Sequence, residues 1–296
     1  MKNNHRFGLL IWLSFCLFSL TEPVNAGIPK GIYITQATME DTKYITYLID
    51  RSKKVGIGTF VVDLELPSEK YQQNIALLKK NGIKYIARII MFPGGGTPEQ
   101  IASAAYRLKK HRMVETALLY GAQEIQLDYI RFNSKQPASS EHALIIKKII
   151  ESFKNRLDSE NIPLQVDVFG ITAYGEEKHI GQSIPLFAST VNTVCPMVYP
   201  SHYEPFPYHY DRPYKTVYDS LVSIKEQFDG KMPVKLFPYI ELSNYHYPKQ
   251  SHENKLKYIY AQIQAVQDAG ADGWYAWSAK NYYDNLFTVL ENNAVK

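Results

Sequence analysis

Several features that commonly reveal the class of a protein are scarce in this sequence of 296 residues. Only two cysteines occur, and because Cys16 lies in an apolar segment at the start of the chain, Cys195 has no partner for a disulfide in the remainder. Lysine and arginine exceed aspartate and glutamate by only four, 33 against 29. So small a net charge excludes the strong basic field of a nucleic-acid-binding protein. No low-complexity tract or linker appears, so a single domain is expected.

Long hydrophobic runs are also missing. The longest apolar stretch, residues 8–20, has thirteen residues, whereas a transmembrane helix needs roughly 20. Two basic residues precede the stretch, and a Val-Asn-Ala sequence at 24–26 follows it, which is typical of a cleavable signal peptide. The pattern predicts a signal peptide over 1–26 and a mature domain over 27–296. The mature protein is expected to be periplasmic or secreted, without stable membrane insertion.

The chain does contain a regular alternation of two kinds of segment. Short runs rich in β-branched and aromatic residues alternate with longer amphipathic stretches, which is typical of β-α units around a parallel sheet. The expected strands are 31–35, 57–65, 83–92, 124–131, 163–169, 192–199, 233–241 and 272–278. The expected helices are 41–54, 69–80, 98–120, 141–159, 182–189, 214–228, 251–269 and 282–292. Eight such units predict an α/β fold, a single (β/α)₈ TIM barrel. An open doubly wound sheet is the alternative, but no glycine-rich phosphate turn follows the first strand to support it.

Polar residues recur inside the apolar strands with the period of two that places them on one face. Gln126 and Asp128 share a face of the fourth expected strand, and Gln165 and Asp167 share a face of the fifth. Barrel enzymes place their chemistry at the C-terminal ends of the strands. Asp128 and Asp167 are therefore candidate catalytic carboxylates, and Glu241 in the seventh expected strand is a third.

Charged residues on the second and third strands allow two interpretations. Asp63 and Glu65 share one face of the second strand. The favoured interpretation is that they are structural ion-pair partners of Arg88, and the alternative is that they belong to a site. Arg131 is a candidate partner for Asp128, although a regular strand directs these two side chains to opposite faces.

The other two acids also have structural interpretations. Asp167 could cap or brace a loop, as Asx side chains commonly do. Glu241 could be an ordinary loop carboxylate, because Pro238 makes the register of its strand uncertain.

Tyrosine is abundant, with 23 residues, and it concentrates after the last expected strands. Residues 199–218 alone hold six tyrosines, and others follow near 239–247 and 282–283. Aromatic rings with a polar group suit the apolar face and hydroxyls of a sugar, although about half of them, such as Tyr214 and Tyr218, are expected to be packing residues. The expected substrate-binding residues are Asp63, Arg88, Arg131, Tyr199, His202, Tyr203 and Trp277.

Histidines in the same region raise the question of a metal site. His202, His209, His246 and His252 do not show HxxxH or HExxH spacing, so neither a metal nor a cofactor is expected. Metal-dependent deacetylation of a glycan would need such a cluster. Cys195, inside an expected strand, is interpreted as a small buried hydrophobic residue.

Five segments resemble a known family: GIYIT at 31–35, ARIIMF at 87–92, EIQLDYIRF at 124–132, VDVFG at 166–170 and PMVYPSHY at 196–203. Together they resemble a family of bacterial glycoside hydrolases with a TIM-barrel domain, distantly akin to α-amylase-like barrels. The resemblance implies that Asp128 is the nucleophile, that Asp167 is an acid and that Glu241 is a further carboxylate. The chain departs from the family pattern after the third strand, where FPGGGTPEQ leads at once into a helix in place of a longer loop.

These observations predict an exported glycoside hydrolase that acts on a polysaccharide or a cell-envelope glycan. One carboxylate, Asp128, would attack or stabilise an oxocarbenium-like centre, and Asp167 would protonate the leaving oxygen. Repulsion between two acids on adjacent strands raises the pKa of one of them and keeps it protonated near neutrality. The alternative is a non-catalytic glycan-binding barrel, which is favoured if the two acids do not face one open cleft. The protein is expected to be a monomer whose partner is a poly- or oligosaccharide.

Overall fold

The computed structural model describes residues 27–243 and 250–293. The predicted signal peptide over 1–26 lies outside the described residues, and so do Tyr245, His246 and Tyr247 of the predicted aromatic loops.

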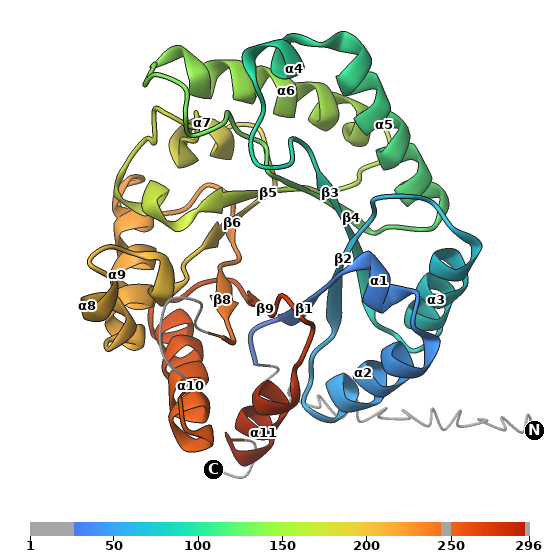
Figure 1. Ribbon diagram of the computed structural model, residues 1–296, viewed down its shortest axis with the longest axis vertical. Helices are drawn as coiled ribbons and strands as arrows, with labels where there is room; N and C mark the ends of the chain where they lie inside the picture. Colours follow the sequence, from blue (N-terminus) through green and yellow to red (C-terminus); the bar gives the residue numbers. More distant parts are fainter. Residues whose placement is uncertain (1–26, 244–249, 294–296) are drawn as a thin grey trace, which may run out of the picture.

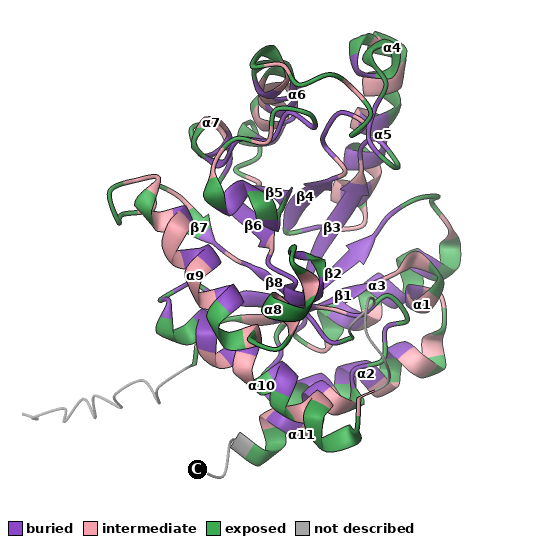
Figure 2. Cartoon of the chain, turned by 60° about the vertical axis from the view of Figure 1, so that its left-hand side comes forward, coloured by how far each residue is buried: buried purple, intermediate pink, exposed green. Residues whose placement is uncertain are grey.

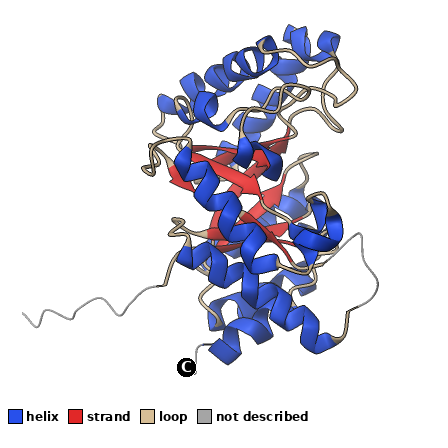
Figure 3. Ribbon diagram, turned by 90° about the vertical axis from the view of Figure 1, so that its left-hand side faces the viewer, coloured by secondary structure: helices blue, strands red, loops and turns tan. Residues whose placement is uncertain are grey.

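The strands form one closed parallel barrel. They are β1 (Lys30–Ile34), β2 (Thr59–Asp63), β3 (Lys84–Ile90), β4 (Glu124–Asp128), β5 (Leu164–Phe169), β6 (Thr193–Met197), β7 (Lys235–Leu236), β8 (Tyr239–Glu241) and β9 (Trp274–Trp277). The order runs from β5 through β4, β3, β2 and β1 to β9, β8 and β6, and a pairing between β5 and β6 closes the ring. Figure 1 shows this ring with helices around it, and Figure 3 shows the strands enclosed by helices. The predicted (β/α)₈ barrel is confirmed.

The seventh strand is interrupted, which corrects the continuous strand expected over 233–241. Its first part, β7, pairs with β6 at Thr193, and its second part, β8, pairs with β6 at Met197 and with β9. Pro238 lies between the two parts and has no backbone N–H for the ladder, so regular pairing stops there.

Helices lie near all eight expected positions, and the two short helices over 36–39 and 206–210 were not predicted. They are α1 (Gln36–Met39), α2 (Thr42–Lys54), α3 (Glu69–Lys80), α4 (Pro98–Ala102), α5 (Ala104–Leu119), α6 (Glu141–Asp158), α7 (Ile184–Ala188), α8 (Phe206–Tyr210), α9 (Pro213–Glu226), α10 (His252–Asp268) and α11 (Asp284–Asn293). The expected helix over 98–120 is two helices, because Ser103 accepts a hydrogen bond from the N–H of Tyr106 (3.2 Å) and starts α5 anew. Two 3₁₀ turns, Gly170–Tyr174 after β5 and Pro200–His202 after β6, were not predicted.

Two apolar layers lie on the two faces of the barrel strands. The larger layer packs between strands and helices and includes Leu236 and Ile240. A smaller cluster fills the barrel interior with Tyr33, Val61, Ile86, Cys195, Tyr199, Tyr239 and Tyr275. Figure 2 shows the strands as buried and the outer helix faces as exposed. The prediction that Cys195 is a buried, apolar-type residue is confirmed, because its side chain has no exposed surface. In the described part of the chain, every helix is too short or too polar to span a bilayer.

Candidate active site

A cleft of about 880 Å³ opens at the C-terminal ends of the strands. Its lining combines carboxylates and an arginine at the base with aromatic residues around them. Among the predicted site residues, Asp63, Arg88, Asp128, Asp167, Tyr199, His202, Tyr203 and Trp277 line this cleft. Asp128 and Asp167 therefore face one open cleft, as the enzymatic interpretation requires. Arg131 and Glu241 are outside its lining.

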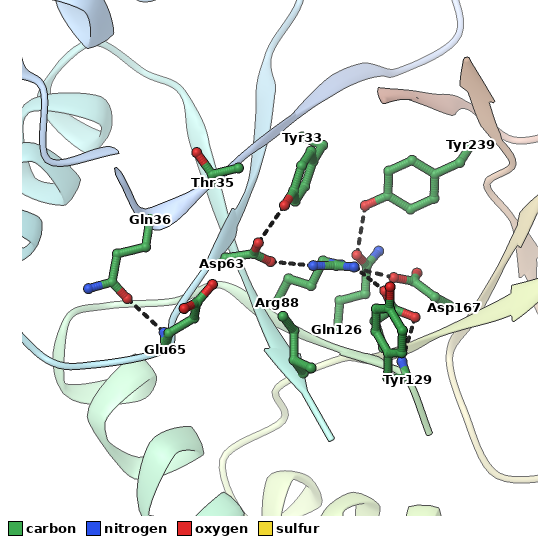
Figure 4. Close-up of polar contacts among 12 residues, drawn as sticks. Tyr33, Thr35, Gln36, Asp63, Glu65, Arg88, Gln126, Tyr129, Asp167 and Tyr239 are labelled. Atoms are coloured by element: carbon green, nitrogen blue, oxygen red, sulfur yellow. Dashed lines mark hydrogen bonds and ion pairs between the residues drawn. The ribbon is translucent and has the colours of Figure 1, made fainter. Parts of the chain in front are cut away.

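Arg88 lies at the centre of three buried carboxylates. Its Nη1 donates to Asp63, its Nη2 donates to Asp128, and its Nε lies 3.3 Å from Oδ2 of Asp167. Figure 4 shows Asp63 and Asp167 on opposite sides of the guanidinium. The register places Arg88 beside Asp63, and it places Asp128 two positions further along the ladder, beside Ile90. The planar fork of arginine suits such convergent acceptors.

The expected ion pair between Asp63 and Arg88 is confirmed, and two alternatives are corrected. Glu65 lies beyond the end of β2, is exposed and lines the cleft, but it makes no ion pair with Arg88. Asp128 pairs with Arg88 rather than with Arg131, whose Nη1 instead donates to the carbonyl of Phe132 (3.0 Å).

The three acids differ in their surroundings. Burial and the nearby charge of Asp128 raise the pKa of Asp167 well above its usual range, although Arg88 opposes this shift. Its Oδ1 is buried and has no hydrogen-bond partner among the described residues, which suits a carboxyl group that carries a proton. Burial also raises the pKa of Asp63, whereas Arg88 and the hydroxyl of Tyr33 (2.5 Å) act to lower it.

Both carboxylate oxygens of Asp128 accept hydrogen bonds. Arg88 donates to Oδ2, and the backbone N–H of Tyr129 donates to Oδ1. Hydrogen bonds that a guanidinium or an amide donates to a carboxylate are stronger than those between neutral groups. The site therefore places Asp128, whose two oxygens both accept hydrogen bonds, beside Asp167, a carboxyl group that favours the neutral form.

Amide side chains form a layer beneath these acids. Gln126 Nε2 donates to Oε1 of Gln165 (2.9 Å), and the hydroxyl of Tyr239 donates to Oε1 of Gln126 (2.7 Å). Both glutamines are almost completely buried inside the barrel. The Gln-x-Asp pattern on the two strands thus faces the lumen as predicted, and the amides brace the strands that carry the acids.

Tyr129 is a cleft residue that the sequence pattern missed. Strand β4 ends at Asp128 instead of continuing to 131, and Tyr129 has a φ of +51° that directs its ring into the cleft. Its neighbour Ile130, which a continuing strand would place on the lumen face with Asp128, packs in the outer core instead. No glycine or asparagine marks this left-handed position, so the strand pattern contained no signal for it.

Arg131 lies behind the rings of the cleft wall. Its guanidinium carbon is 5.5 Å from the ring centroid of Tyr129 and 4.8 Å from that of Phe169. The side chain is 8% exposed, so its cation supports the rings from the protein side.

Aromatic side chains from the segment after β6 and from β9 form another wall. The rings of Tyr199 and Trp277 stack with a centroid distance of 4.9 Å and an interplanar angle of 13°, and the ring of His202 lies 5.3 Å from Tyr199. Tyr203 accepts a hydrogen bond from Ser220 (3.1 Å) and packs tightly on the end of β5. Contact between these residues and a sugar stays a prediction.

Glu241 is completely buried and holds the turn that follows β6. Its carboxylate accepts hydrogen bonds from the N–H of Ser201 (2.7 Å), from the hydroxyl of Ser201 (2.8 Å) and from Tyr258 (2.6 Å). Nδ1 of His202 lies 3.6 Å from the same carboxylate. Glu241 therefore contacts the segment that carries His202 and Tyr199 rather than the cleft.

Within residues 27–243 and 250–293, no group of three or more His, Cys, Asp or Glu side chains is arranged to hold a metal ion. The space between Asp63, Asp128 and Asp167 is taken by the guanidinium of Arg88.

Comparison with known proteins places this geometry in context. Residues 103–283, more than half of the chain, match the model of a family described as "Putative glycosyl hydrolase domain". No curated protein matches the chain.

Three solved structures illustrate the similarity of the fold. The spore cortex-lytic enzyme SleL of Bacillus cereus has a TM-score of 0.64 and 13% identity, with 90% of this chain and 74% of that chain covered. The endo-β-1,4-mannanase of Thermotoga petrophila has a TM-score of 0.62 and 13% identity, with 90% and 76% covered. A chitinase of Chromobacterium violaceum has a TM-score of 0.61 and 11% identity, with 91% and 100% covered. At these identities the likeness shows a common barrel fold.

Proposed function

The chain belongs to this glycosyl hydrolase family, and we propose that it is an exported glycoside hydrolase that cleaves a polysaccharide or a cell-envelope glycan with Asp128 and Asp167. One observation carries the proposal: two buried carboxyl groups with different surroundings face one aromatic-lined cleft at the catalytic end of a barrel.

The proposed chemistry divides the two carboxyl groups by charge. Glycosidic cleavage needs one carboxylate to attack or stabilise the oxocarbenium-like centre and one acid to protonate the leaving oxygen. Asp128, with donors from Arg88 and a backbone amide, takes the first role. Asp167 takes the second role, because burial and the neighbouring Asp128 raise its pKa and favour the protonated form.

Arg88 and Asp63 are proposed to position this pair. Arg88 supplies one positive charge to three carboxylates, which favours retention of one proton in the cluster. Asp63 contacts the opposite edge of the guanidinium and is itself held by Tyr33, so the orientation of Arg88 is fixed from the far side.

Sugar binding is proposed for the walls of the cleft. The stacked rings of Tyr199 and Trp277 would contact the apolar face of a pyranose, and His202 and Tyr203 would contact its hydroxyl groups. Arg131 would act through the rings that it supports. Glu241 is proposed as a positioning residue, since its carboxylate is occupied by Ser201 and Tyr258.

The proposal also includes export of the protein and a distant relation to another group of barrels. Export rests on the apolar segment and cleavage pattern of residues 1–26. The distant relation to α-amylase-like barrels rests on the LDYIRF segment, which brings Asp128 and Tyr129 to the cleft.

The proposal is tested by release of reducing ends from peptidoglycan, chitin, β-1,4-mannan and starch. We expect hydrolysis of at least one glycan and a loss of about 10³-fold or more with Asp128→Asn, because the swap keeps the shape and removes the charge that stabilises the transition state. Asp50→Asn, an exposed change on α2, serves as the control. Binding of a glycan without hydrolysis, unaffected by Asp128→Asn, would establish the non-catalytic alternative.

A further inference from the structure

A second group of apolar side chains lines the cleft beyond the proposed sugar contacts. Phe169, Ile171 and Tyr174, here called the β5 strip, are 37%, 49% and 53% exposed. All three lie in the last residue of β5 and the 3₁₀ turn after it, and all three line the 880 Å³ cleft. Single exposed apolar residues are ordinary, but three within six residues that face one cavity form a contact surface.

The strip is exposed but held from behind. The N–H of Phe169 donates to Oε1 of Gln182 (2.9 Å), and the Arg131 guanidinium stacks on the ring of Phe169. Nε2 of Gln227 donates to the carbonyls of Thr172 (3.1 Å) and Ala173 (2.8 Å). A surface fixed in this way loses little conformational entropy when a ligand binds.

Tyr174 is fixed at the other end of the strip. Its ring meets the ring of Tyr203 edge to face, at 6.4 Å and 85°, and its hydroxyl lies 3.3 Å from that of Ser220. The strip therefore extends from Phe169, near Asp167, to Tyr174, which contacts Tyr203.

The location of the strip identifies which part of a substrate it contacts. Phe169 follows Asp167 by two residues, so both side chains leave β5 on the lumen face, with Phe169 nearer the mouth of the cleft. A sugar that stacks on Phe169 lies next to the proposed acid. Because Asp167 donates its proton to the leaving side of the bond and Asp128 acts on the other sugar, we assign this ring to the sugar that leaves.

The composition of the segment identifies the chemistry of the ligand. Residues 169–175 (FGITAYG) contain no charged side chain, and the guanidinium of Arg131 is covered by the rings. An uncharged pyranose, whose C–H face packs on aromatic and aliphatic groups, fits this surface better than an acidic sugar.

We propose that the β5 strip is a leaving-group subsite that stacks an uncharged pyranose ring, so that the enzyme acts on chains with sugars on both sides of the cleaved bond. This inference rests on the proposed function, because it uses Asp167 as the acid.

The kinetic test compares two substrates that differ only on the leaving side. Phe169→Ala and Tyr174→Ala should lower kcat/KM for a hexasaccharide of the hydrolysed glycan at least tenfold, mainly through KM, which corresponds to about 1.4 kcal/mol. The same variants should stay within about twofold of the parent on the matching glycosyl fluoride, because fluoride is too small to reach the strip. Tyr282→Ala, at a 67% exposed tyrosine outside the cleft lining, is the control. Equal effects on both substrates, or no effect on either, would overturn the inference.

A binding test keeps this inference separate from the proposed function. In the Asp128→Asn background, chitin and β-1,4-mannan hexasaccharides are titrated by tryptophan fluorescence, with and without Phe169→Ala. We expect at least one to bind and Phe169→Ala to weaken it at least tenfold, even if no glycan is hydrolysed. Binding that Phe169→Ala leaves unchanged, or no binding of either hexasaccharide, would overturn the subsite. Failure of hydrolysis with intact, Phe169-dependent binding would overturn only the proposed function.

Discussion

The protonation state of Asp167 can be measured through the pH dependence of protein stability, without any substrate. Asp167→Asn keeps the size of the side chain but removes the titrating group. In the folded protein, burial and Asp128 raise the pKa of Asp167, whereas in the unfolded chain it is about 3.9. Between these two values the folded state binds one more proton than the unfolded state, so the stability of the parent falls as the pH rises.

The magnitude follows from proton linkage. The parent should lose about 1.4 kcal/mol relative to Asp167→Asn for each pH unit between the unfolded and the folded pKa. The contribution of Asp167 is complete below the unfolded pKa and is lost as the pH rises through the folded pKa, above which the difference becomes constant. Since about 1 kcal/mol corresponds to about 2–4 °C in Tm for a domain near this size, the difference in Tm should change by about 3–6 °C per pH unit.

The assay is thermal unfolding of both proteins from pH 4 to pH 9, with Asp50→Asn as the exposed control. The slope with pH carries the test, because the amide also changes the contacts of a buried oxygen. A raised pKa of Asp167 would be refuted if the difference in stability between the parent and Asp167→Asn were independent of pH, or if the parent gained stability relative to the variant as the pH rose. Asp167 would then be an ordinary ionised partner of Arg88. It could not then serve as the acid.

Three further changes test the packing around the site. Arg88→Met should lower the free energy of unfolding by about 3–5 kcal/mol in a urea titration, because it leaves buried carboxylates without their cation; an unchanged midpoint would contradict the ion-pair arrangement. Gly170→Ala should cost about 1–3 kcal/mol, since a Cβ would lie 2.2 Å from Oη of Tyr203, whereas Gly58→Ala meets no atom within 4 Å and should leave the urea midpoint nearly unchanged. Glu241→Gln should cost about 1–3 kcal/mol through its weakened hydrogen bonds and keep activity on an activated aryl glycoside within tenfold; complete loss of that activity in folded protein would make Glu241 catalytic.

The barrel and the base of its cleft could be predicted because strand geometry imposes a period of two. That period alone predicted Gln126 and Asp128 on the lumen face with Gln165 and Asp167. The positions of the longer helices were predictable for a similar reason, since amphipathic runs and cap residues are local features, whereas the short helices α1 and α8 were not predicted.

The ion-pair partner of Asp128 and the residue at which β4 ends could not be predicted from the sequence pattern, because both depend on tertiary structure. Asp128 meets Arg88 because Ile90 pairs with Asp128 across β3 and β4, and no pattern within a single strand contains that register. Tyr129 enters the cleft through a left-handed backbone conformation that tyrosine does not favour, so its position could not be inferred from its type.

The division of work between Asp128 and Asp167 is tested most directly by measuring kcat/KM for both Asn variants on one unactivated oligosaccharide and one activated aryl glycoside. Asp128→Asn should abolish turnover of both substrates, because the oxocarbenium-like centre loses its carboxylate in each case. Asp167→Asn should reduce turnover of the oligosaccharide by about 10²–10⁴-fold and that of the aryl glycoside far less, since that leaving group departs without a proton. Equal losses on both substrates for the two variants would contradict the assigned roles, and full activity in both would place the active site elsewhere.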